Sequence, residues 1–245
     1  MVAAKRGHEV HLFEKADRLG GQFYTASIPP SKGEIAGFIA WQRRQLEENH
    51  VFVHLNTELT EEIVNEQNPD VVVLATGSTP VSPDLPGVKR ANVVTAHDVL
   101  EGRTVVGQRV AVIGGGMVGS ETANHLANHG KEVSIVEILP EIAADINARS
   151  KPFLLKDLAE HNVRLYLNSK VKEVLADGLR IERDGREEKI GPFDTIILAV
   201  GVQPCNDLAY KLEGKAARLI TIGDASNPRK ALEAIREGYL AGLEV

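Results

Sequence analysis

Residues 109–119 read Arg-Val-Ala-Val-Ile-Gly-Gly-Gly-Met-Val-Gly, and the fold of the chain can be inferred from them. An apolar run of strand length comes first, three glycines follow it, and a helix is predicted over 117–129. A pyrophosphate binds where backbone N–H groups at a helix N-terminus can approach it closely, and side chains would prevent that approach. Gly114 permits the tight turn, Gly116 admits the phosphate, and Gly119 lets the helix pack on the strand. A purely structural glycine turn is the alternative interpretation.

The next acidic residue supports the dinucleotide interpretation. Glu137 follows the strand predicted over 132–136. A carboxylate at this place accepts hydrogen bonds from a ribose 2′-hydroxyl and repels a 2′-phosphate, which favours NAD(H) over NADP(H). Met117 and Val118 open the predicted helix and complete the expected phosphate cradle. A solvated acid at the end of a strand is the alternative interpretation of Glu137.

An internal repeat predicts two units of this kind. Residues 6–14, Arg-Gly-His-Glu-Val-His-Leu-Phe-Glu, resemble residues 129–137, His-Gly-Lys-Glu-Val-Ser-Ile-Val-Glu. Each stretch reads as a helix end, a glycine stop, a strand and a terminal acid, so Glu14 corresponds to Glu137. The matching phosphate loop would fall before Met1. The first unit is therefore expected to lack its first strand and loop, as a fragment of a longer protein or a truncated reading frame would; an N-terminal helix before an ordinary strand is the alternative.

Strand patterns alternate with helix patterns along the chain, which predicts an α/β fold with two doubly wound parallel sheets of Rossmann type. Proline and glycine mark residues 78–88 as a linker, and residues 163–183 read as a hairpin that turns at Asp177-Gly178. The other strands are expected over 9–13, 51–55, 71–75, 109–113, 132–136, 195–200 and 219–222, and the helices over 33–49, 60–66, 117–129, 150–161 and 230–243.

Composition excludes several functional classes. The 245 residues are 43% hydrophobic and carry a net charge of -6 without a basic run, which argues against nucleic-acid and membrane-surface binding. No apolar run approaches the roughly 18 residues of a membrane span. The single cysteine, Cys205, excludes an internal disulfide, a CxxC redox pair, a cysteine-ligated iron–sulfur cluster and structural zinc, and no metal site is expected. Charged residues near Met1 interrupt any signal-peptide core, so a cytoplasmic protein is expected.

Five motifs follow one another in a characteristic order. Glu14 precedes Leu19-Gly-Gly-Gln22, and then come Ala75-Thr-Gly77, the 114–119 loop, Ala199-Val-Gly201 and Thr221-Ile-Gly-Asp224. This order resembles the flavoprotein oxidoreductases with two dinucleotide domains. It is most similar to the C-terminal module of the trimethylamine dehydrogenase, 2,4-dienoyl-CoA reductase and enoate reductase group, and is similar to the small subunit of glutamate synthase. The resemblance covers nearly the whole chain.

The resemblance implies an FAD-type or ADP-type domain over 1–100 plus 206–245, with an NAD(H) domain inserted over 101–205. The NAD(H) ligands that it implies are Gly114, Gly116, Gly119, Glu137 and Gly201. The FAD ligands that it implies are Glu14, Gly21, Gln22, Thr76, Gly77, Gly223, Asp224, Ala231 and Leu232. Arg18 could meet a phosphate or be an ordinary surface arginine. A turn or capping role is the alternative for Asp224.

The implied chemistry is hydride transfer from NADH to FAD, and from there to a partner redox centre outside the chain, such as the FMN and iron–sulfur module of a parent enzyme. Because the first phosphate loop is absent, weak or no FAD binding by this chain is expected. A non-catalytic fragment that binds ADP or NAD is the alternative function. No catalytic acid or base is predicted, because His97, His125 and His129 lack any spacing signature. A family-like Pro-Asn segment explains the surroundings of Cys205, with a reactive thiol as the alternative.

Overall fold

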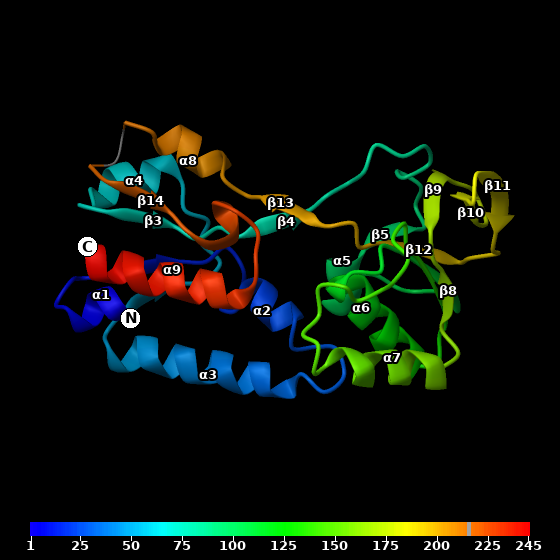
Figure 1. Ribbon diagram of the computed structural model, residues 1–245. Coiled ribbons are helices and arrows are strands. Elements are labelled where there is room, and N and C mark those ends of the chain that lie inside the picture. Colours follow the sequence, from blue (N-terminus) through cyan, green and yellow to red (C-terminus); the bar gives the residue numbers. More distant parts are fainter. Residues whose placement is uncertain (215–216) are drawn as a thin grey trace. The chain divides into compact units, whose positions relative to one another are not determined.

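The structure, a computed structural model, describes residues 1–214 and 217–245, which form two compact units (Figure 1). Unit 1 comprises residues Met1–Ser27, Lys32–Thr79 and Val202–Val245, and unit 2 comprises Ile28–Ser31 and Pro80–Gly201. Unit 2 is thus inserted into unit 1 along the chain. Its boundaries differ from the predicted 101–205, because residues 80–100 associate with the inserted unit.

Unit 2 is built on a five-stranded parallel sheet with the strand order β5-β12-β6-β7-β8. Among these five strands, β5 comes first along the chain and β12 comes last, and the two pair with each other through Val93 opposite Ile196. This pairing is the reason that residues before 101 belong to the inserted unit. The bounds are β5 (Val93–Thr95), β6 (Arg109–Ile113), β7 (Glu132–Val136), β8 (Arg164–Tyr166) and β12 (Thr195–Leu198).

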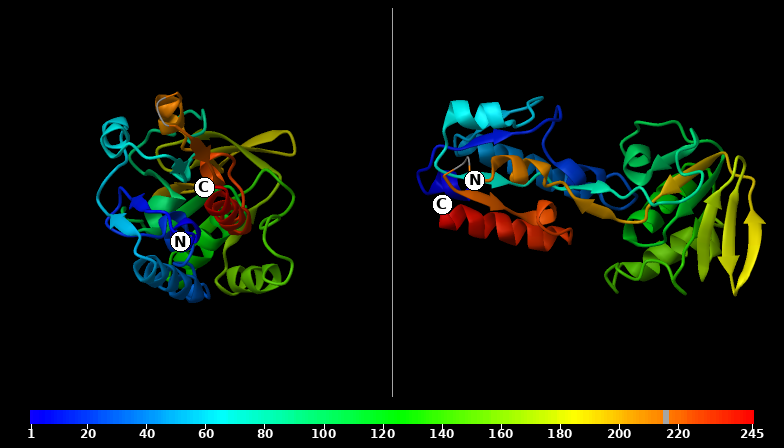
Figure 2. Two further views of the ribbon diagram at one scale, coloured as in Figure 1. Left: turned by 90° about the vertical axis from the view of Figure 1, so that its left-hand side faces the viewer. Right: turned by 90° about the horizontal axis from the view of Figure 1, so that it is seen from above.

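The two faces of this sheet are covered differently. Val110 and Val112 of β6 are fully buried against three helices, α5 (Ala96–Leu100), α6 (Met117–Asn128) and α7 (Lys151–Glu160). Ala111 and Ile113 alternate with them and face an antiparallel meander of β9 (Ser169–Val174), β10 (Leu179–Arg183) and β11 (Arg186–Ile190), whose strands lie side by side in Figure 2. The period of two along β6 therefore buries both faces.

The meander corrects one prediction. The predicted hairpin exists as β9 and β10, with a turn at Asp177-Gly178 closed by the Leu175 N–H bond to the Gly178 carbonyl. β8 belongs to the central sheet instead, and β11 was not predicted. β11 contains the charged residues Arg186, Glu187 and Lys189, as edge strands often do. It therefore lacks the apolar run from which a strand is predicted.

Unit 1 contains two separate pairs of parallel strands. β1 (His11–Phe13) pairs with β2 (Phe52–His54), and β3 (Val72–Leu74) pairs with β14 (Leu219–Thr221) as predicted. No pairing joins the two sheets within residues 1–214 and 217–245. β4 (Ser78–Pro80) and β13 (Val202–Pro204) pair where the chain leaves and re-enters unit 1.

The helices of unit 1 follow their sequence signals. Thr60 caps α4 (Glu61–Gln67) by accepting a hydrogen bond from the Ile63 N–H. Leu212 and Leu74 are buried between α4, α8 (Asp207–Leu212) and the β3–β14 pair. The remaining helices are α1 (Val2–Lys5), α2 (Gly21–Thr25), α3 (Gly33–Glu48), the 3₁₀ turn η1 (Gly223–Ala225) and α9 (Ala231–Glu244). No helix in the described part of the chain is both long enough and apolar enough to cross a membrane.

The internal repeat is visible in the backbone. Gly7 follows α1 and Gly130 follows α6, and both adopt the left-handed conformation, with φ of +97° and +76°. Each is followed by a parallel strand, β1 or β7. At the ends of those strands, Glu14 and Glu137 each accept a bond from the N–H two residues later, both 2.8 Å long. The two stretches thus have the same local structure.

Candidate dinucleotide sites

The phosphate loop of unit 2 cannot accept side chains at two of its glycines. Gly114 has φ of +99°, and a Cβ there would lie 2.3 Å from the carbonyl oxygen of Ala199. A Cβ on Gly119 would lie 1.9 Å from the carbonyl oxygen of Gly114. Both glycines are therefore required by the close contact of the loop with β12 and α6, whatever the loop binds.

Gly116 differs from these two glycines. Its φ is -65°, and a Cβ there would lie 3.7 Å from the nearest atom, a carboxylate oxygen of Asp145, which is an ordinary contact. Gly116 is the N-cap of α6, whose first residues are Met117 and Val118. Neither the backbone conformation nor the packing of the fold therefore requires glycine at this position.

Glu137 is not a solvated acid. Only 7% of the residue is exposed, and its two carboxylate oxygens accept hydrogen bonds from the backbone N–H groups of Gly115 and Leu139. The Gly115 bond ties the acid to the phosphate loop. Each carboxylate oxygen keeps a second lone pair, so Glu137 can still accept a hydroxyl of a ribose placed at the loop.

Two further residues of unit 2, Ala199 and Gly201, lie directly after β12. Gly201 has φ of +106°, and its carbonyl accepts the Val81 N–H at 3.0 Å. No atom lies within 4 Å of a Cβ built there, so its glycine reflects backbone conformation. Ala199 lies against Gly114 and Gly119, which brings the end of β12 to the phosphate loop.

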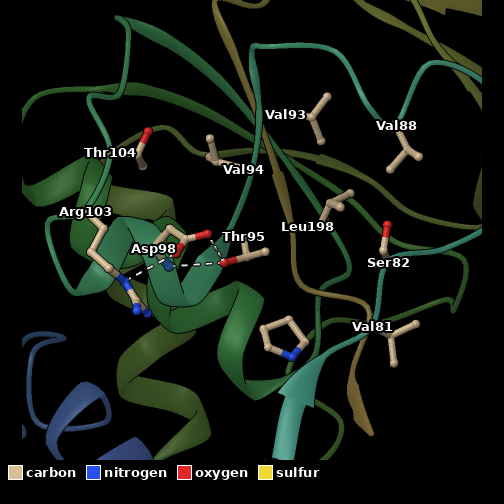
Figure 3. Close-up of a pocket in the computed structure, with 11 residues that line it drawn as sticks. Val81, Ser82, Val88, Val93, Val94, Thr95, Asp98, Arg103, Thr104 and Leu198 are labelled. Carbon is tan, nitrogen blue, oxygen red and sulfur yellow. Dashed lines mark hydrogen bonds and ion pairs between the residues drawn. The ribbon is translucent and has the colours of Figure 1, made fainter. Parts of the chain in front are cut away.

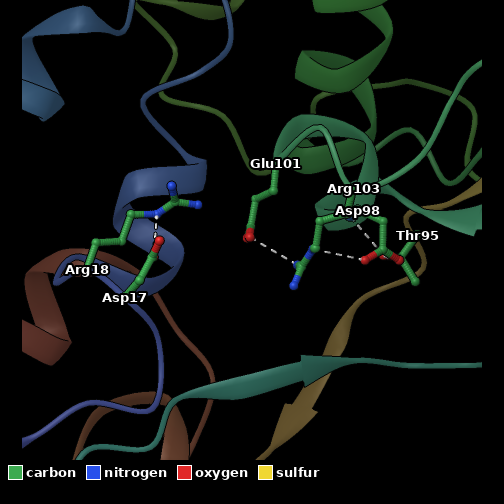
Figure 4. Close-up of polar contacts among 6 residues, drawn as sticks. All are labelled: Asp17, Arg18, Thr95, Asp98, Glu101 and Arg103. Carbon is green, nitrogen blue, oxygen red and sulfur yellow. Dashed lines mark hydrogen bonds and ion pairs between the residues drawn. The ribbon is translucent and has the colours of Figure 1, made fainter. Parts of the chain in front are cut away.

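A cavity of about 370 Å³ also lies in unit 2 (Figure 3). Val81, Val93 and Leu198 supply apolar lining, and Arg103 supplies charge. The Arg103 guanidinium is paired with Asp98 at 3.3 Å and with Glu101 at 3.1 Å, as Figure 4 shows. None of the predicted site residues lines this cavity.

In unit 1 the structure brings together Gln22, Ser78 and Asp224, which lie far apart in the sequence. The Gln22 side-chain amide donates to the Ser78 hydroxyl at 2.7 Å, and that hydroxyl donates to Asp224 Oδ2 at 3.1 Å. Gln22 also lies beside Gly77, whose φ is +75°. Ser78 was missed by the sequence analysis, because only its place directly after the Ala75-Thr-Gly77 motif could have indicated it.

Asp224 has a structural role as well. Its Oδ1 accepts the Arg229 N–H at 3.0 Å, a bond that closes the turn before α9 and agrees with the turn role of the alternative interpretation. Glu237 of α9 supports the same turn by accepting the Gly223 N–H at 2.7 Å and pairing with the Arg229 guanidinium. The Gly223 bond and then Arg229 lower the pKa of Glu237. Glu237 and Arg229 were also missed by the sequence analysis.

The other predicted residues of unit 1 lie at turns and helix starts. Glu14 follows β1, with its N–H bonded to the His54 carbonyl at 2.9 Å. The Arg18 guanidinium lies over the Tyr24 ring, 4.2 Å from its centroid. It also lies 4.0 Å from the Asp17 carboxylate, the pair that Figure 4 shows. Gly21 opens α2 with φ of +47°, and Ala231 opens α9 followed by Leu232, which is 73% exposed.

The surroundings of Cys205 are held by backbone bonds. The Thr76 hydroxyl donates to the Cys205 carbonyl, and the Cys205 N–H donates to the Gly77 carbonyl at 2.9 Å. These backbone bonds agree with the interpretation of the surroundings of Cys205 as a family-like Pro-Asn segment.

Among the described residues, no group of three or more His, Cys, Asp or Glu side chains could hold a metal ion. Burial is the main reason that the pKa values of His97 and His125 are lowered.

Comparison with known proteins shows the family of the chain. The sequence model of the pyridine nucleotide-disulphide oxidoreductase family matches residues 1–225. Bilirubin reductase of Mediterraneibacter gnavus is 37% identical over 98% of the chain, and an NADH oxidase of Thermoanaerobacter brockii is 36% identical over 100% of it. The structure of a 2-naphthoyl-CoA reductase complex superposes with a TM-score of 0.95 at 31% identity over 99% of the chain.

The relatives are larger than this chain, which spans 37% of the bilirubin reductase, 38% of the NADH oxidase and 37% of the 2-naphthoyl-CoA reductase. A cinnamate reductase of Clostridium sporogenes is 33% identical over 97% of the chain. The resemblance to reductase flavoenzymes stated from the sequence is therefore confirmed. The chain belongs to the pyridine nucleotide-disulphide oxidoreductase family and has the α/β fold of these FAD-dependent oxidoreductases, a membership that points to FAD and NAD(H) as the cofactors.

Proposed function

We propose that this chain is the module of a larger flavoenzyme that passes a hydride from NADH to FAD, from which electrons continue to a redox centre outside the chain. The observation that carries the proposal is the 114–119 loop with Glu137 buried on it. Bound FAD accepts a hydride from a nicotinamide and passes electrons on singly or in pairs. The protein binds and orients both cofactors.

Unit 2 fits a dinucleotide by its donors and its space. The N–H groups of Met117 and Val118 open a helix of 12 residues, where the helix dipole favours a pyrophosphate. Gly116 leaves the room that the phosphates need. Glu137 accepts the ribose hydroxyls and repels a 2′-phosphate, which makes NADH the preferred dinucleotide. Gly114, Gly119 and Gly201 shape the backbone around this site.

Unit 1 fits the ribityl and phosphate portion of FAD. Asp224 is fixed by Ser78 and by the Arg229 N–H, so its carboxylate is oriented to accept polyol hydroxyls. Gln22 lies beside Gly77 and donates to the Ser78 carbonyl, so it lines the same turn, in which Thr76 precedes Gly77. We assign Glu14 to the adenosine ribose, Gly21 and Arg18 to the pyrophosphate side, Gly223 to the phosphate side, and Ala231 and Leu232 to the flavin ring.

The electron acceptor proposed for this module is an FMN and iron–sulfur centre of the parent enzyme. Cys205 is the single cysteine of the chain, so a CxxC dithiol cannot be the acceptor here. A reducing compartment suits this arrangement, and we propose the cytoplasm as its location.

The test uses the full-length protein that contains this chain. Anaerobic addition of NADH should bleach the absorbance of bound flavin, and NADPH should do so only at higher concentration. Asp224→Asn should lower the FAD content, while Asp157→Asn, which lies on α7 of unit 2, serves as the control and should not. Purification without flavin, together with NADH binding, would instead support the alternative of a non-catalytic nucleotide-binding fragment.

A further inference from the structure

The segment 142–145, which follows β7, is built onto the phosphate loop. Ile142 and Ala143 are 3% and 0% exposed, and the Ala143 N–H donates to the Gly115 carbonyl at 2.6 Å. Ala143 has φ of +55°, a left-handed conformation that costs a residue with a Cβ free energy. Burial and the Gly115 bond hold the segment in this conformation, so the position of its last residue is fixed by structure.

That last residue, Asp145, presents a carboxylate to the start of α6. Its Oδ1 accepts the Met117 N–H at 2.8 Å, and both oxygens lie 3.7–3.8 Å from a Cβ built on Gly116. The residue itself is exposed to solvent. The carboxylate therefore takes the N–H group, and the space over Gly116, that an anion at this helix terminus would use.

We propose that Asp145 sets the affinity of the site for dinucleotides, as a tethered anion that must give up the Met117 N–H when a pyrophosphate binds. The inference rests on the proposed function, because it takes the 114–119 loop as the dinucleotide site. Two anions at one N–H repel each other, so Asp145 competes with the phosphates. A competitor fixed within the same chain has a high effective concentration and lowers the apparent affinity of the free ligand.

Of the acidic residues near the phosphate loop, Asp145 is the one whose carboxylate accepts the Met117 N–H. Glu141 lies on the same loop, but its carboxylate is exposed and paired with the Lys151 ammonium at 2.6 Å. Glu137 also lies at the loop, but its oxygens face Gly115 and Leu139 and leave Met117 to Asp145. Removing the charge of Asp145 should therefore strengthen binding of phosphate-bearing ligands, whereas removing that of Glu141 should not.

The experiment measures the Kd of NADH and of ADP-ribose by isothermal titration calorimetry on the full-length protein. Asp145→Asn keeps the shape of the side chain and should tighten both ligands roughly three- to tenfold at low salt. The gain should shrink at 1 M salt, because charge repulsion is then screened within about 3 Å. Glu141→Gln is the matched control and should leave both Kd values unchanged.

The outcomes separate this inference from the proposed function. No binding of NADH by the wild type or either variant contradicts the proposed function and removes the basis of the inference. Binding by the wild type, with an unchanged or weakened Kd in Asp145→Asn, contradicts the inference alone. An equal gain in Glu141→Gln would do the same, since it would show a general effect of loop charge. A salt-sensitive gain confined to Asp145→Asn supports it.

Discussion

Gly116 and Gly119 belong to one motif, but the structure predicts opposite consequences of replacing each by alanine. In Gly119→Ala the new Cβ would lie 1.9 Å from the Gly114 carbonyl oxygen, about 1.5 Å short of the 3.4 Å at which ordinary contact begins. That atom is backbone, so α6 or the loop has to move. In Gly116→Ala the nearest atom lies at 3.7 Å, and nothing has to move.

The expected free energies follow from these distances. Overpacking of this severity costs about 3 kcal/mol, and the helix propensity of alanine returns up to about 1 kcal/mol, so Gly119→Ala should lose about 2 kcal/mol. For a unit of this size that corresponds to a fall in Tm of roughly 4–8 °C. Alanine at an N-cap costs at most about 1 kcal/mol relative to glycine, so Gly116→Ala should lose less than about 4 °C.

The replacement at Gly116 should instead act mainly on NADH binding. Gly116→Ala places a methyl group where the pyrophosphate would approach, and we expect its NADH affinity to fall at least about tenfold, or 1.4 kcal/mol, in a protein that remains folded. Thermal unfolding and NADH titration of the two variants in parallel provide the assay. NADH binding by Gly116→Ala that equals that of the wild type, or equal Tm values of the two variants, would contradict these expectations.

Three other predictions test other parts of the molecule. Glu137→Arg should shift the preference from NADH toward NADPH by at least about tenfold, measured as the ratio of the two Kd values; an unchanged ratio would remove the role given to the acid. The Arg109 guanidinium lowers the pKa of Asp194 from 3.8 to about 2, so the stabilisation from this pair should be complete above about pH 4 and lost as the pH falls toward 2. Urea midpoints of the wild type and Asp194→Asn should thus converge at low pH, and a difference independent of pH would contradict this. Ser78→Ala removes the hydroxyl between the Gln22 amide and Asp224, so more FAD should be lost on dialysis than from the wild type; equal retention would show that the hydroxyl is dispensable.

Local sequence patterns predict the parts of the site that are made locally. The 114–119 loop, the strands β6 and β7 and the acid Glu137 follow one another along the chain, so spacing alone indicates their arrangement. The pairing of β14 with β3 was also predictable, from the order of the motifs. In these cases each residue type suits the backbone conformation or the hydrogen bonds at its own position.

Contacts between distant segments could not be predicted in this way. Ser78 reaches Asp224, and Asp145 reaches Met117, through the fold, and neither residue has a spacing signal of its own. The boundary near residue 100 was placed wrongly because β5 is only three residues long, and its membership depends on pairing with β12. The strand β11 carries too many charges to stand out as a strand.

The insertion of unit 2 into unit 1 has a consequence for synthesis on the ribosome. All five strands of the central sheet of unit 2 lie between Val93 and Leu198, so this unit can fold as soon as that stretch has emerged. The partner of β3 is β14, which is translated only afterwards, so Val72 cannot pair with Leu219 until then. Unit 1 is thus completed last, and β3 remains accessible to chaperones while the inserted unit is already folded.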